Sequence, residues 1–326
     1  MNLHEDKKLF IEAVKFTAQQ KGIKDIYIEK DYWVTLALKT IFEDPIGKET
    51  IFKGGTALSK CFNSIERFSE DIDLVVIRNE SESANKLKSK IKRITKVVGE
   101  LIPEVEIENI THKKGMIRKT AHDYSKQFDG NFGQVRDIII IEATWLGYFE
   151  PYFAKQVSSY IYDMMVATGQ YEIAKQYDLL PFDVLVLDSR RTLCEKIMSL
   201  VRFSHTNTPI EDLQNKIRHT YDINQLLKEV EIQEFFISDD FDEMLLKVAN
   251  DDVRSFKNNN DWLRKHPTEA IIFSEPEKTW EQLNDTYNDN FRHLVYGEFP
   301  TGNEILETLN TVSKRLKDIS WDIRLD

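Results

Sequence analysis

Cysteine is scarce in this chain, since Cys61 and Cys194 are the only two among its 326 residues. Neither has a partner at metal-ligand spacing, which excludes the common zinc ribbons and fingers. The seven histidines are scattered and contain no pair spaced i, i+4, so the sequence gives no support to a zinc hydrolase. Two thiols in a chain of this length indicate a reducing compartment.

Long apolar runs are also missing. None approaches the roughly 18 residues of a membrane-spanning helix, and the stretch from Met1 to Lys21 has no signal-peptide core. We therefore expect a cytoplasmic protein with no membrane partner. At 41% hydrophobic residues the chain can bury a substantial core, and its length suggests about two domains.

Positive charge is in deficit, because 44 basic residues face 55 acidic ones and the net charge is −11. That balance argues against nonspecific nucleic-acid binding over the whole surface but leaves room for a local basic groove. Two basic clusters are candidates, although a solvated helix face explains the first at least as well. They are Lys86, Lys88, Lys90, Lys92, Arg93 and Lys96, and then Lys113, Lys114, Arg118 and Lys119.

The most informative stretch runs from Ile51 to Ile77 and predicts a strand, a glycine turn, a helix and a second strand. The second strand carries Asp71 and Asp73. Because side chains alternate along a strand, these two carboxylates share one face while Ile72 and Leu74 point to the opposite, buried face. Adjacent anions repel unless a cation or water separates them, and Mg²⁺ prefers a few hard carboxylate oxygens. The pair therefore predicts a magnesium site.

The glycine turn before this strand predicts a place for a triphosphate. Gly54 and Gly55 lack the Cβ atoms that would keep a phosphate from the main chain, and Thr56 is expected to open a helix with its hydroxyl and free amides. The stretch from Gly54 to Lys60 is not a Walker P-loop, because the second half of that motif is missing. Ordinary P-loop ATPases are thus disfavoured.

The whole pattern is Gly-Gly-Thr, a helix, and then Arg-x-Ser-x-Asp-x-Asp, in which Arg67 and Ser69 precede the acidic pair. It resembles the first motif of polymerase-β-type nucleotidyltransferases, and more narrowly that of the AbiEii/AbiGii toxin family. The stretch Glu29-Lys30-Asp31-Tyr32 also resembles one that family members carry before the glycines. The resemblance covers about residues 26 to 226 and leaves the last hundred residues unassigned.

A polymerase-β-type site has a third carboxylate, so that two metal ions can bridge the attacking oxygen, the α-phosphate and the leaving pyrophosphate. The best candidate is Glu142, which ends the apolar stretch from Val135 and follows a run of four isoleucines. Such a run predicts a strand that is buried on both faces, where an unpaired charge is costly. Asp137 is the alternative, although at the entrance of the strand it also suits a turn.

Apolar residues at helical spacing predict a helix from Arg191 to Leu200, with Lys196 on the edge of its apolar stripe. The resemblance implies that Lys196 binds nucleotide phosphate and that Asp222 supports the site as a base or as the partner of the lysine. His219 stands where the family usually has an acid, which weakens any role for that position. Arg67 and Ser69 are weaker nucleotide-binding candidates, and Arg67 is also suited to pair with a carboxylate and fix the loop.

The fold class that this pattern implies is α/β, or α+β, with a polymerase-β-type nucleotidyltransferase core. Helices are expected over residues 2–21, where Gly22 ends the helix, and over 29–43, and strands over 50–148, broken by a basic helix. From Val157 onward the pattern is mostly helical, with Pro181 to Asp188 as a connecting segment. We place the domains at 1–156 and 157–326, and expect Trp280, Tyr287, Phe291 and Trp321 in the core.

The function that the resemblance implies is Mg²⁺-dependent transfer of a nucleoside monophosphate from an NTP to an acceptor hydroxyl. It further implies a toxin of a bacterial toxin–antitoxin or abortive-infection system in phage defence or growth control, with a tRNA 3′ end as one possible acceptor and an antitoxin as partner. Fold and site do not fix the acceptor. The alternatives are a nucleotide-binding regulatory or partner-binding protein without turnover, and an antibiotic nucleotidyltransferase.

Overall fold

The computed structural model describes residues 1–325 except for 70, 80, 131–134 and 257–258. The chain forms two compact units. The first comprises Met1–Asn63 and Phe68–Leu187, and the second comprises Ser64–Arg67 and Asp188–Asp326. The main boundary between the units therefore follows Leu187, whereas the sequence pattern places it after residue 156. Four residues of an earlier loop, Ser64–Arg67, also belong to the second unit.

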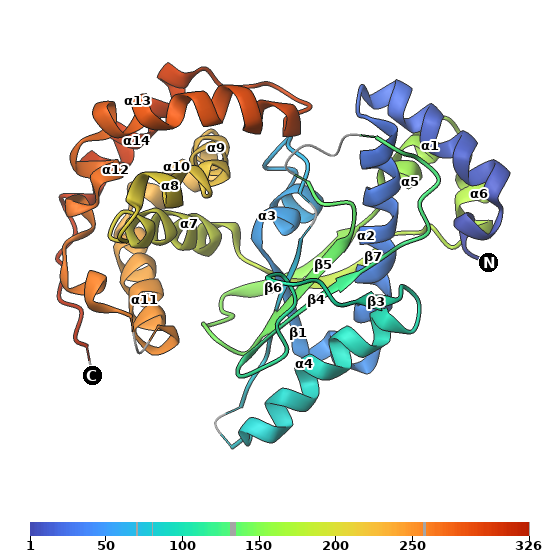
Figure 1. Ribbon diagram of the computed structural model, residues 1–326, viewed down its shortest axis with the longest axis horizontal. Coiled ribbons are helices and arrows are strands. Elements are labelled where there is room, and N and C mark those ends of the chain that lie inside the picture. The colour runs from blue at the N-terminus through green and yellow to red at the C-terminus, as the bar shows by residue number, and fades with distance from the viewer. Residues whose placement is uncertain (70, 80, 131–134, 257–258, 326) are drawn as a thin grey trace. The chain divides into compact units, whose positions relative to one another are not determined.

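The first unit contains six α-helices and seven strands among its described residues, and Figure 1 shows them. The helices are α1 (Lys7–Lys21), α2 (Asp25–Glu43), α3 (Gly54–Ala57), α4 (Ala84–Gly99), α5 (Tyr160–Ala167) and α6 (Tyr171–Gln176). The strands are β1 (Thr50–Lys53), β2 (Ile72–Val76), β3 (Glu104–Val105), β4 (Ile117–His122), β5 (Ile139–Thr144), β6 (Tyr152–Val157) and β7 (Phe182–Leu187). As expected, Gly22 ends α1, in a left-handed conformation at φ 65°.

The strands form one mixed sheet in the order β3-β4-β5-β2-β1-β7-β6. The pairs β2–β5 and β1–β7 are parallel and the other neighbours are antiparallel. Helix α4 lies on one face, because Arg118 of β4 donates from Nε to Thr95 Oγ1 of this helix at 2.6 Å, and α2 packs against α4. Phe52, Ile72 and Leu74 point to that face and are buried.

Strand β5 shows why its sequence is so apolar. Ile139, Ile140 and Ile141 have no exposed surface, so both faces of this strand are buried, as the isoleucine run predicts. The strand is shorter than the stretch from Val135 and begins at Ile139. Glu142 does not end it, because Ala143 and Thr144 continue the ladder with β2. The expectation of a charge at the strand end is therefore wrong, and Glu142 is a charge inside a ladder.

The segment from Pro181 to Asp188 is not a connection. Its central six residues form β7, which pairs with β1 and β6 inside the sheet. Val184 and Val186 are buried while Asp183 is exposed, which is the alternation of a strand with one covered face. This strand ends the first unit at Leu187, and it explains why the first unit extends beyond residue 156.

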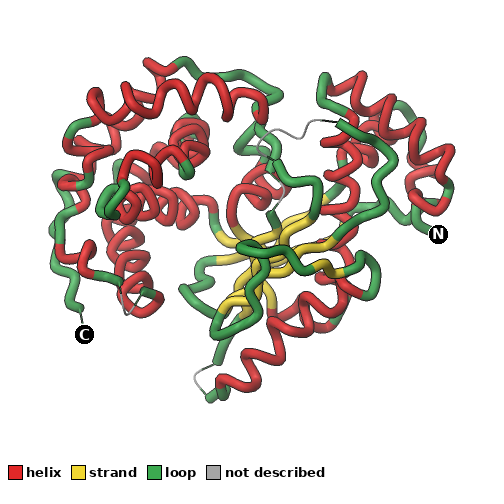
Figure 2. The backbone as a smooth tube through the Cα atoms, in the orientation of Figure 1, coloured by secondary structure: helices red, strands yellow, loops and turns green. Residues whose placement is uncertain are grey.

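The second unit is helical, and Figure 2 shows no strand after β7 in the described part of the chain. Its helices are α7 (Ser189–Phe203), α8 (Pro209–Gln214), α9 (Ile217–Leu226), α10 (Val230–Phe236), α11 (Asp239–Ser255), α12 (Ile271–Ser274), α13 (Pro276–Asp285) and α14 (Gly302–Leu316). Helix α7 packs against α9 and α11. Trp280, Tyr287 and Phe291 are buried as expected, whereas Trp321 is only half-buried.

No helix formed by the described residues combines the length and the apolar character that crossing a bilayer requires.

Candidate functional site

Four charged residues lie side by side across four neighbouring strands of the first unit. Glu142 of β5 pairs with Asp73 of β2 in parallel register, and Lys119 of β4 and Lys53 of β1 occupy the next positions on either side. Residues that pair in register project to the same face of a sheet. The order across the strands is therefore lysine, glutamate, aspartate, lysine. We call these four residues the charged row.

The charged row lies on the face of the sheet opposite to α4. Asp73 alternates with Ile72 and Leu74, which point toward the helices, so Asp71 and Asp73 share the other face, as the sequence predicts. Asp71 directly precedes β2. Three carboxylates therefore belong to one face of one sheet, although Glu142 is more than sixty positions away along the chain.

The carboxyl group of Asp73 binds protons more tightly than an ordinary aspartate. Burial raises its pKa, and repulsion by Glu142 and Asp71 raises it further, to about 7, while Lys53 and Lys119 pull it down. A raised pKa means that the ionised form is disfavoured in the folded protein. The sheet thus holds a negative charge at Asp73 under electrostatic strain that a divalent cation would relieve.

Gly54 serves Asp73 directly. Its backbone is left-handed at φ 81°, and a Cβ atom at this position would lie 2.3 Å from Asp73 Oδ2. A side chain at residue 54 would therefore displace the carboxylate. The structure shows that this glycine makes room for Asp73, and its expected role in letting a phosphate approach the main chain stays a prediction.

Thr56 does not open the helix that follows. Helix α3 begins at Gly54 with Lys53 as its N-cap, and Thr56 lies buried inside it. The Thr56 hydroxyl donates to the Asp71 carbonyl at 2.6 Å and lies 3.0 Å from Ser69 Oγ. Thr56 and Ser69 therefore tie the helix to the entrance of β2, and the hydroxyl of Thr56 is engaged within the protein. Their role in nucleotide binding stays a prediction.

We call the sheet face that carries Asp71, Asp73 and Glu142 the acidic face. It offers carboxylate oxygens, which are ligands that suit Mg²⁺. Asp71 Oδ1 is buried and has no hydrogen-bond partner among the described residues, so this oxygen needs a cation or a water. Asp73 adds a strained carboxylate beside it. Among the described residues, no three His, Cys, Asp or Glu side chains are already arranged so that they could hold a metal ion. Glu142 is instead bound to Lys119, with 3.1 Å between Glu142 Oε2 and the ammonium.

Asp137, the alternative third carboxylate, has a different environment. It precedes β5, its side chain is 59% exposed, and it pairs with Lys126 at 2.9 Å. The register of β5 places Glu142, not Asp137, opposite Asp73. The geometry therefore favours Glu142 as the third acidic residue of this face.

A separate cluster in the second unit joins Arg67, Lys196 and Asp222, which we call the buried triad. Arg67 donates to both carboxylate oxygens of Asp222, at 2.7 and 2.8 Å, and Lys196 donates to Oδ2 at 2.6 Å. All three side chains are almost completely buried. The expectation that Arg67 pairs with a carboxylate is confirmed, and Asp222 is the partner of Lys196.

The contacts of the buried triad favour Asp222 as the partner of Lys196 over Asp222 as a base. Burial alone would raise the pKa of its carboxyl, but Arg67 and Lys196 outweigh that effect and hold the pKa well below its usual value. A group with so low a pKa is a poor proton acceptor. Two cations share one anion here, so the triad itself carries a net charge of +1, which suits an anionic ligand.

His219 borders the buried triad on α9. Burial and the nearby charges of Lys196 and Lys216 lower its pKa well below the usual value, so the imidazole is neutral. Its Nδ1 is buried without a hydrogen-bond partner among the described residues. A neutral ring at this position leaves the positive charge of the triad undiminished, whereas an acid would cancel it.

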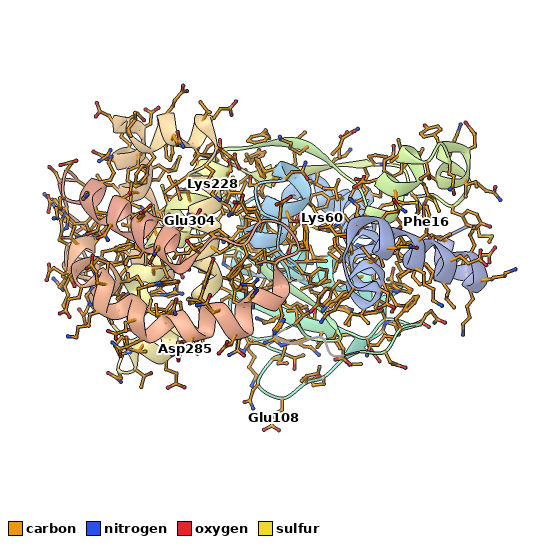
Figure 3. The ribbon with its side chains drawn as sticks, turned by 90° about the horizontal axis from the view of Figure 1, so that it is seen from above. Phe16, Lys60, Glu108, Lys228, Asp285 and Glu304 are labelled. Atoms are coloured by element: carbon orange, nitrogen blue, oxygen red, sulfur yellow. The ribbon has the colours of Figure 1, made fainter. Side chains whose placement is uncertain are left out.

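Charged residues in α2 anchor segments of the first unit that lie far apart in the sequence. Asp31 binds Lys60 at 2.6 Å and accepts from the Tyr160 amide at 2.8 Å. Lys60, labelled in Figure 3, belongs to the π-helical turn Leu58–Phe62 that continues α3. Glu29 accepts from two backbone amides of the loop before β5, and burial raises its pKa to about 7. Buried charges in α2 therefore fix both segments.

The two basic clusters are not uniformly positive surfaces. In α4, Lys90 is buried and bonded to Glu49 and Glu82, and Arg93 pairs with Asp44. In the second cluster, Lys113 pairs with Glu104 and Glu106, Arg118 with Glu104, and Lys119 with Glu142. Most of these basic residues have acidic partners, so the clusters add little to the case for a nucleic-acid groove.

The fold and its acidic sheet face define the class of protein: a mixed α/β protein of the nucleotidyltransferase type. A family model described as nucleotidyl transferase AbiEii toxin, type IV TA system, matches residues 36–315, which is most of the chain. The protein therefore belongs to the AbiEii family of nucleotidyl transferase toxins of type IV toxin–antitoxin systems. The comparison with curated proteins gave no significant match.

Sequence reasoning missed Lys53 and noticed Lys119 only as part of a basic cluster. Lys53 directly precedes Gly54, which is a local signal. Lys119 gives no such signal, because only the pairing of β4 with β5 brings it to Glu142. The sequence also could not show that Arg67 belongs to the second unit while Ser69 belongs to the first, although one motif contains both.

Proposed function

We propose that this protein transfers a nucleoside monophosphate from an NTP to an acceptor hydroxyl of RNA, such as the 3′ end of a tRNA, in a reaction that depends on Mg²⁺. The oxygen of an acceptor hydroxyl attacks the α-phosphorus in line and its proton passes to water. The bond between the α-phosphorus and the oxygen that bridges to the β-phosphorus breaks, and pyrophosphate leaves with that oxygen. Membership of the AbiEii family supports the reaction class. The RNA acceptor rests on the resemblance rather than on the basic clusters.

The observation that carries the proposal is the pairing of Asp73 with Glu142 on one sheet face, beside the unpartnered oxygen of Asp71. Three carboxylates on one face are unfavourable in a protein without a cationic ligand. Asp71, Asp73 and Glu142 would hold Mg²⁺, which when bound neutralises negative charge on the reacting phosphates. Because Gly54 has no side chain, the carboxylate of Asp73 can keep its position on this face.

The remaining residues have separate tasks in this proposal. The resemblance assigns Lys196 to nucleotide phosphate, and within the second unit Asp222 with Arg67 fixes the lysine in one orientation by short hydrogen bonds. Gly54 and Gly55 bring the main chain close to the nucleotide. Thr56 and Ser69 contribute to nucleotide binding by holding the entrance of β2 in place with their hydroxyl groups.

In the cell, such an activity would make the protein the toxin of a bacterial pair, active in abortive infection or phage defence, with an antitoxin as its partner. The family description supports the toxin and the pairing with an antitoxin. We place the protein in the cytoplasm, where NTP and tRNA are available, on the ground that the chain has two cysteines and both are unpaired and buried.

The test is to incubate the purified protein with Mg²⁺, each labelled NTP in turn, and total tRNA. The proposal predicts label in the tRNA that disappears when Asp71 is changed to Ala or Mg²⁺ is removed. Tight NTP binding without transfer to any acceptor would contradict it and indicate a regulatory nucleotide-binding protein. Transfer to an aminoglycoside but not to RNA would indicate an antibiotic-modifying enzyme.

A further inference from the structure

Lys119 forms an ion pair with Glu142, the carboxylate that the proposed metal site needs as its third ligand. Its ammonium lies 3.1 Å from Glu142 Oε2, and the two residues face each other across the β4–β5 ladder. Their side chains are 30% and 36% exposed, so neither is locked in a packed interior. An ion pair this accessible contributes little to stability. Its position beside the acidic face calls for another explanation.

The arrangement of the charged row supplies one. Asp73 and Glu142 are neighbours in register, and Lys119 flanks the pair on the Glu142 side. With Asp71 on the same face, the carboxylates repel one another, and the lysine offsets part of that repulsion in the protein without ligand. A divalent cation offsets the same repulsion more strongly, and it uses the same carboxylate oxygens. Lysine and cation are therefore competitors for Glu142.

We propose that Lys119 is a positioning residue of the metal site, whose ion pair with Glu142 has to break before Glu142 can bind a divalent cation. This inference rests on the proposed function, because it takes Glu142 as a metal ligand. Lys119 lowers the affinity of the nucleotide-free protein for the cation. When a triphosphate is bound, its oxygens offer the ammonium a new partner, so nucleotide and cation bind cooperatively.

The experiment measures Mn²⁺ binding to the full-length protein without nucleotide, by calorimetry or by electron paramagnetic resonance of free Mn²⁺. Lys119→Met should bind Mn²⁺ about threefold to fivefold more tightly than the wild type, because Glu142 no longer has to break an ion pair worth up to about 1 kcal/mol before it binds the cation. Lys119→Gln should behave like Lys119→Met. Lys119→Arg keeps the charge and the ion pair and should bind like the wild type.

Two further variants separate the ion pair from a general change of charge. Lys114→Met removes the same charge from an exposed residue of the segment before β4 and should leave Mn²⁺ affinity within about twofold of the wild type. In a Glu142→Gln background the ion pair no longer exists. There, Lys119→Met should tighten binding much less than it does in the wild type, because no ion pair has to break.

The proposal is overturned if Lys119→Met and Lys119→Gln bind Mn²⁺ no more tightly than the wild type. It is also overturned if Lys114→Met tightens binding as much as they do, or if none of the proteins binds Mn²⁺. The proposed function has its own test. A protein that shows the Lys119 effect but transfers no nucleotide would refute the function alone, and one that transfers nucleotide without the effect would refute the inference alone.

Discussion

At the scale of single residues, Asp73 links stability to function. Its pKa of about 7 lies above that of an unfolded aspartate, so the folded protein binds the proton more tightly than the unfolded chain does. The folded state therefore loses stability as the pH rises from about 4 to about 7, and the loss is complete above that range. Residues that bind ligands often carry such a cost, because the ligand, not the fold, satisfies their charge.

Asp73→Asn should accordingly raise the melting temperature while it abolishes transfer. The amide is neutral, so the repulsion from Glu142 and Asp71 disappears, and we expect an increase of at least about 3 °C at pH 8. At pH 5 the wild-type carboxyl is itself protonated, and the difference should shrink. Thermal unfolding at the two pH values measures both effects.

Asp137→Asn is the matched control for this variant, because it removes an exposed carboxylate close to the same sheet. It should leave transfer intact and should not raise the melting temperature. A wild-type rate of transfer in Asp73→Asn would remove this residue from the metal site.

Gly54→Ala tests whether the glycine exists for the sake of Asp73. The new Cβ would lie 2.3 Å from Asp73 Oδ2, so the carboxylate has to move, and Mn²⁺ affinity should fall at least about tenfold. Gly169→Ala is the control, because Gly169 has a similar positive φ of 75° but open space around it. Equal losses of metal affinity in the two variants would show that backbone strain, not the displaced carboxylate, is responsible.

At the scale of elements, the buried triad joins α7, α9 and the segment Ser64–Arg67. Asp222→Asn keeps the shape of the side chain but leaves the buried Arg67 and Lys196 without their anion. Removing one partner of a buried ion pair costs about 3–5 kcal/mol, so the second unit should lose stability by that order. Urea unfolding followed by a signal from the second unit measures the change.

Asp261→Asn provides the comparison, because Asp261 pairs with Arg264 at the surface of the same unit and should contribute less than about 1 kcal/mol. Similar small effects in the two variants would mean that the triad is not a structural cluster. The contrast with Asp73→Asn is instructive: loss of an aspartate should stabilise one unit and destabilise the other.

Some secondary-structure elements could be predicted from the sequence and others could not. The period of two at Asp71 and Asp73 and the isoleucine run of β5 predicted their strands, because these patterns are local. Strand β7 was missed because a six-residue apolar stretch after a proline also suits a connection, and its partners β1 and β6 are set by tertiary pairing. Glu142 was chosen correctly as a residue of this sheet face, yet its place within the strand was not.

Register is the part that one sequence could not supply. The charged row depends on β4, β5, β2 and β1 pairing at one particular alignment, and a shift of one residue would turn every side chain to the other face. The neighbours of Asp73 and Glu142 are therefore a property of the folded sheet. For the same reason, the sequence could predict that Arg67 pairs with a carboxylate but not that this carboxylate belongs to Asp222.

At the scale of the whole molecule, Mg²⁺ should stabilise the protein in a manner that depends on pH. Binding requires the ionised form of Asp73, and it relieves the repulsion that this form creates. The rise in melting temperature on addition of Mg²⁺ should therefore be larger at pH 8 than at pH 6, and it should be nearly absent in Asp73→Asn. Glu29 also has a pKa of about 7, but it binds backbone amides and should not contribute to the Mg²⁺ effect.

The central claim is that the acidic face of the sheet binds the metal that serves nucleotidyl transfer. A crystal structure with Mn²⁺ and a non-hydrolysable NTP analogue tests this claim most directly, because anomalous scattering locates the metal. We predict Mn²⁺ bound to Asp71, Asp73 and Glu142, in contact with the triphosphate, and Lys119 turned away from Glu142. Mn²⁺ and nucleotide bound elsewhere, with Lys119 still paired to Glu142, would contradict the account.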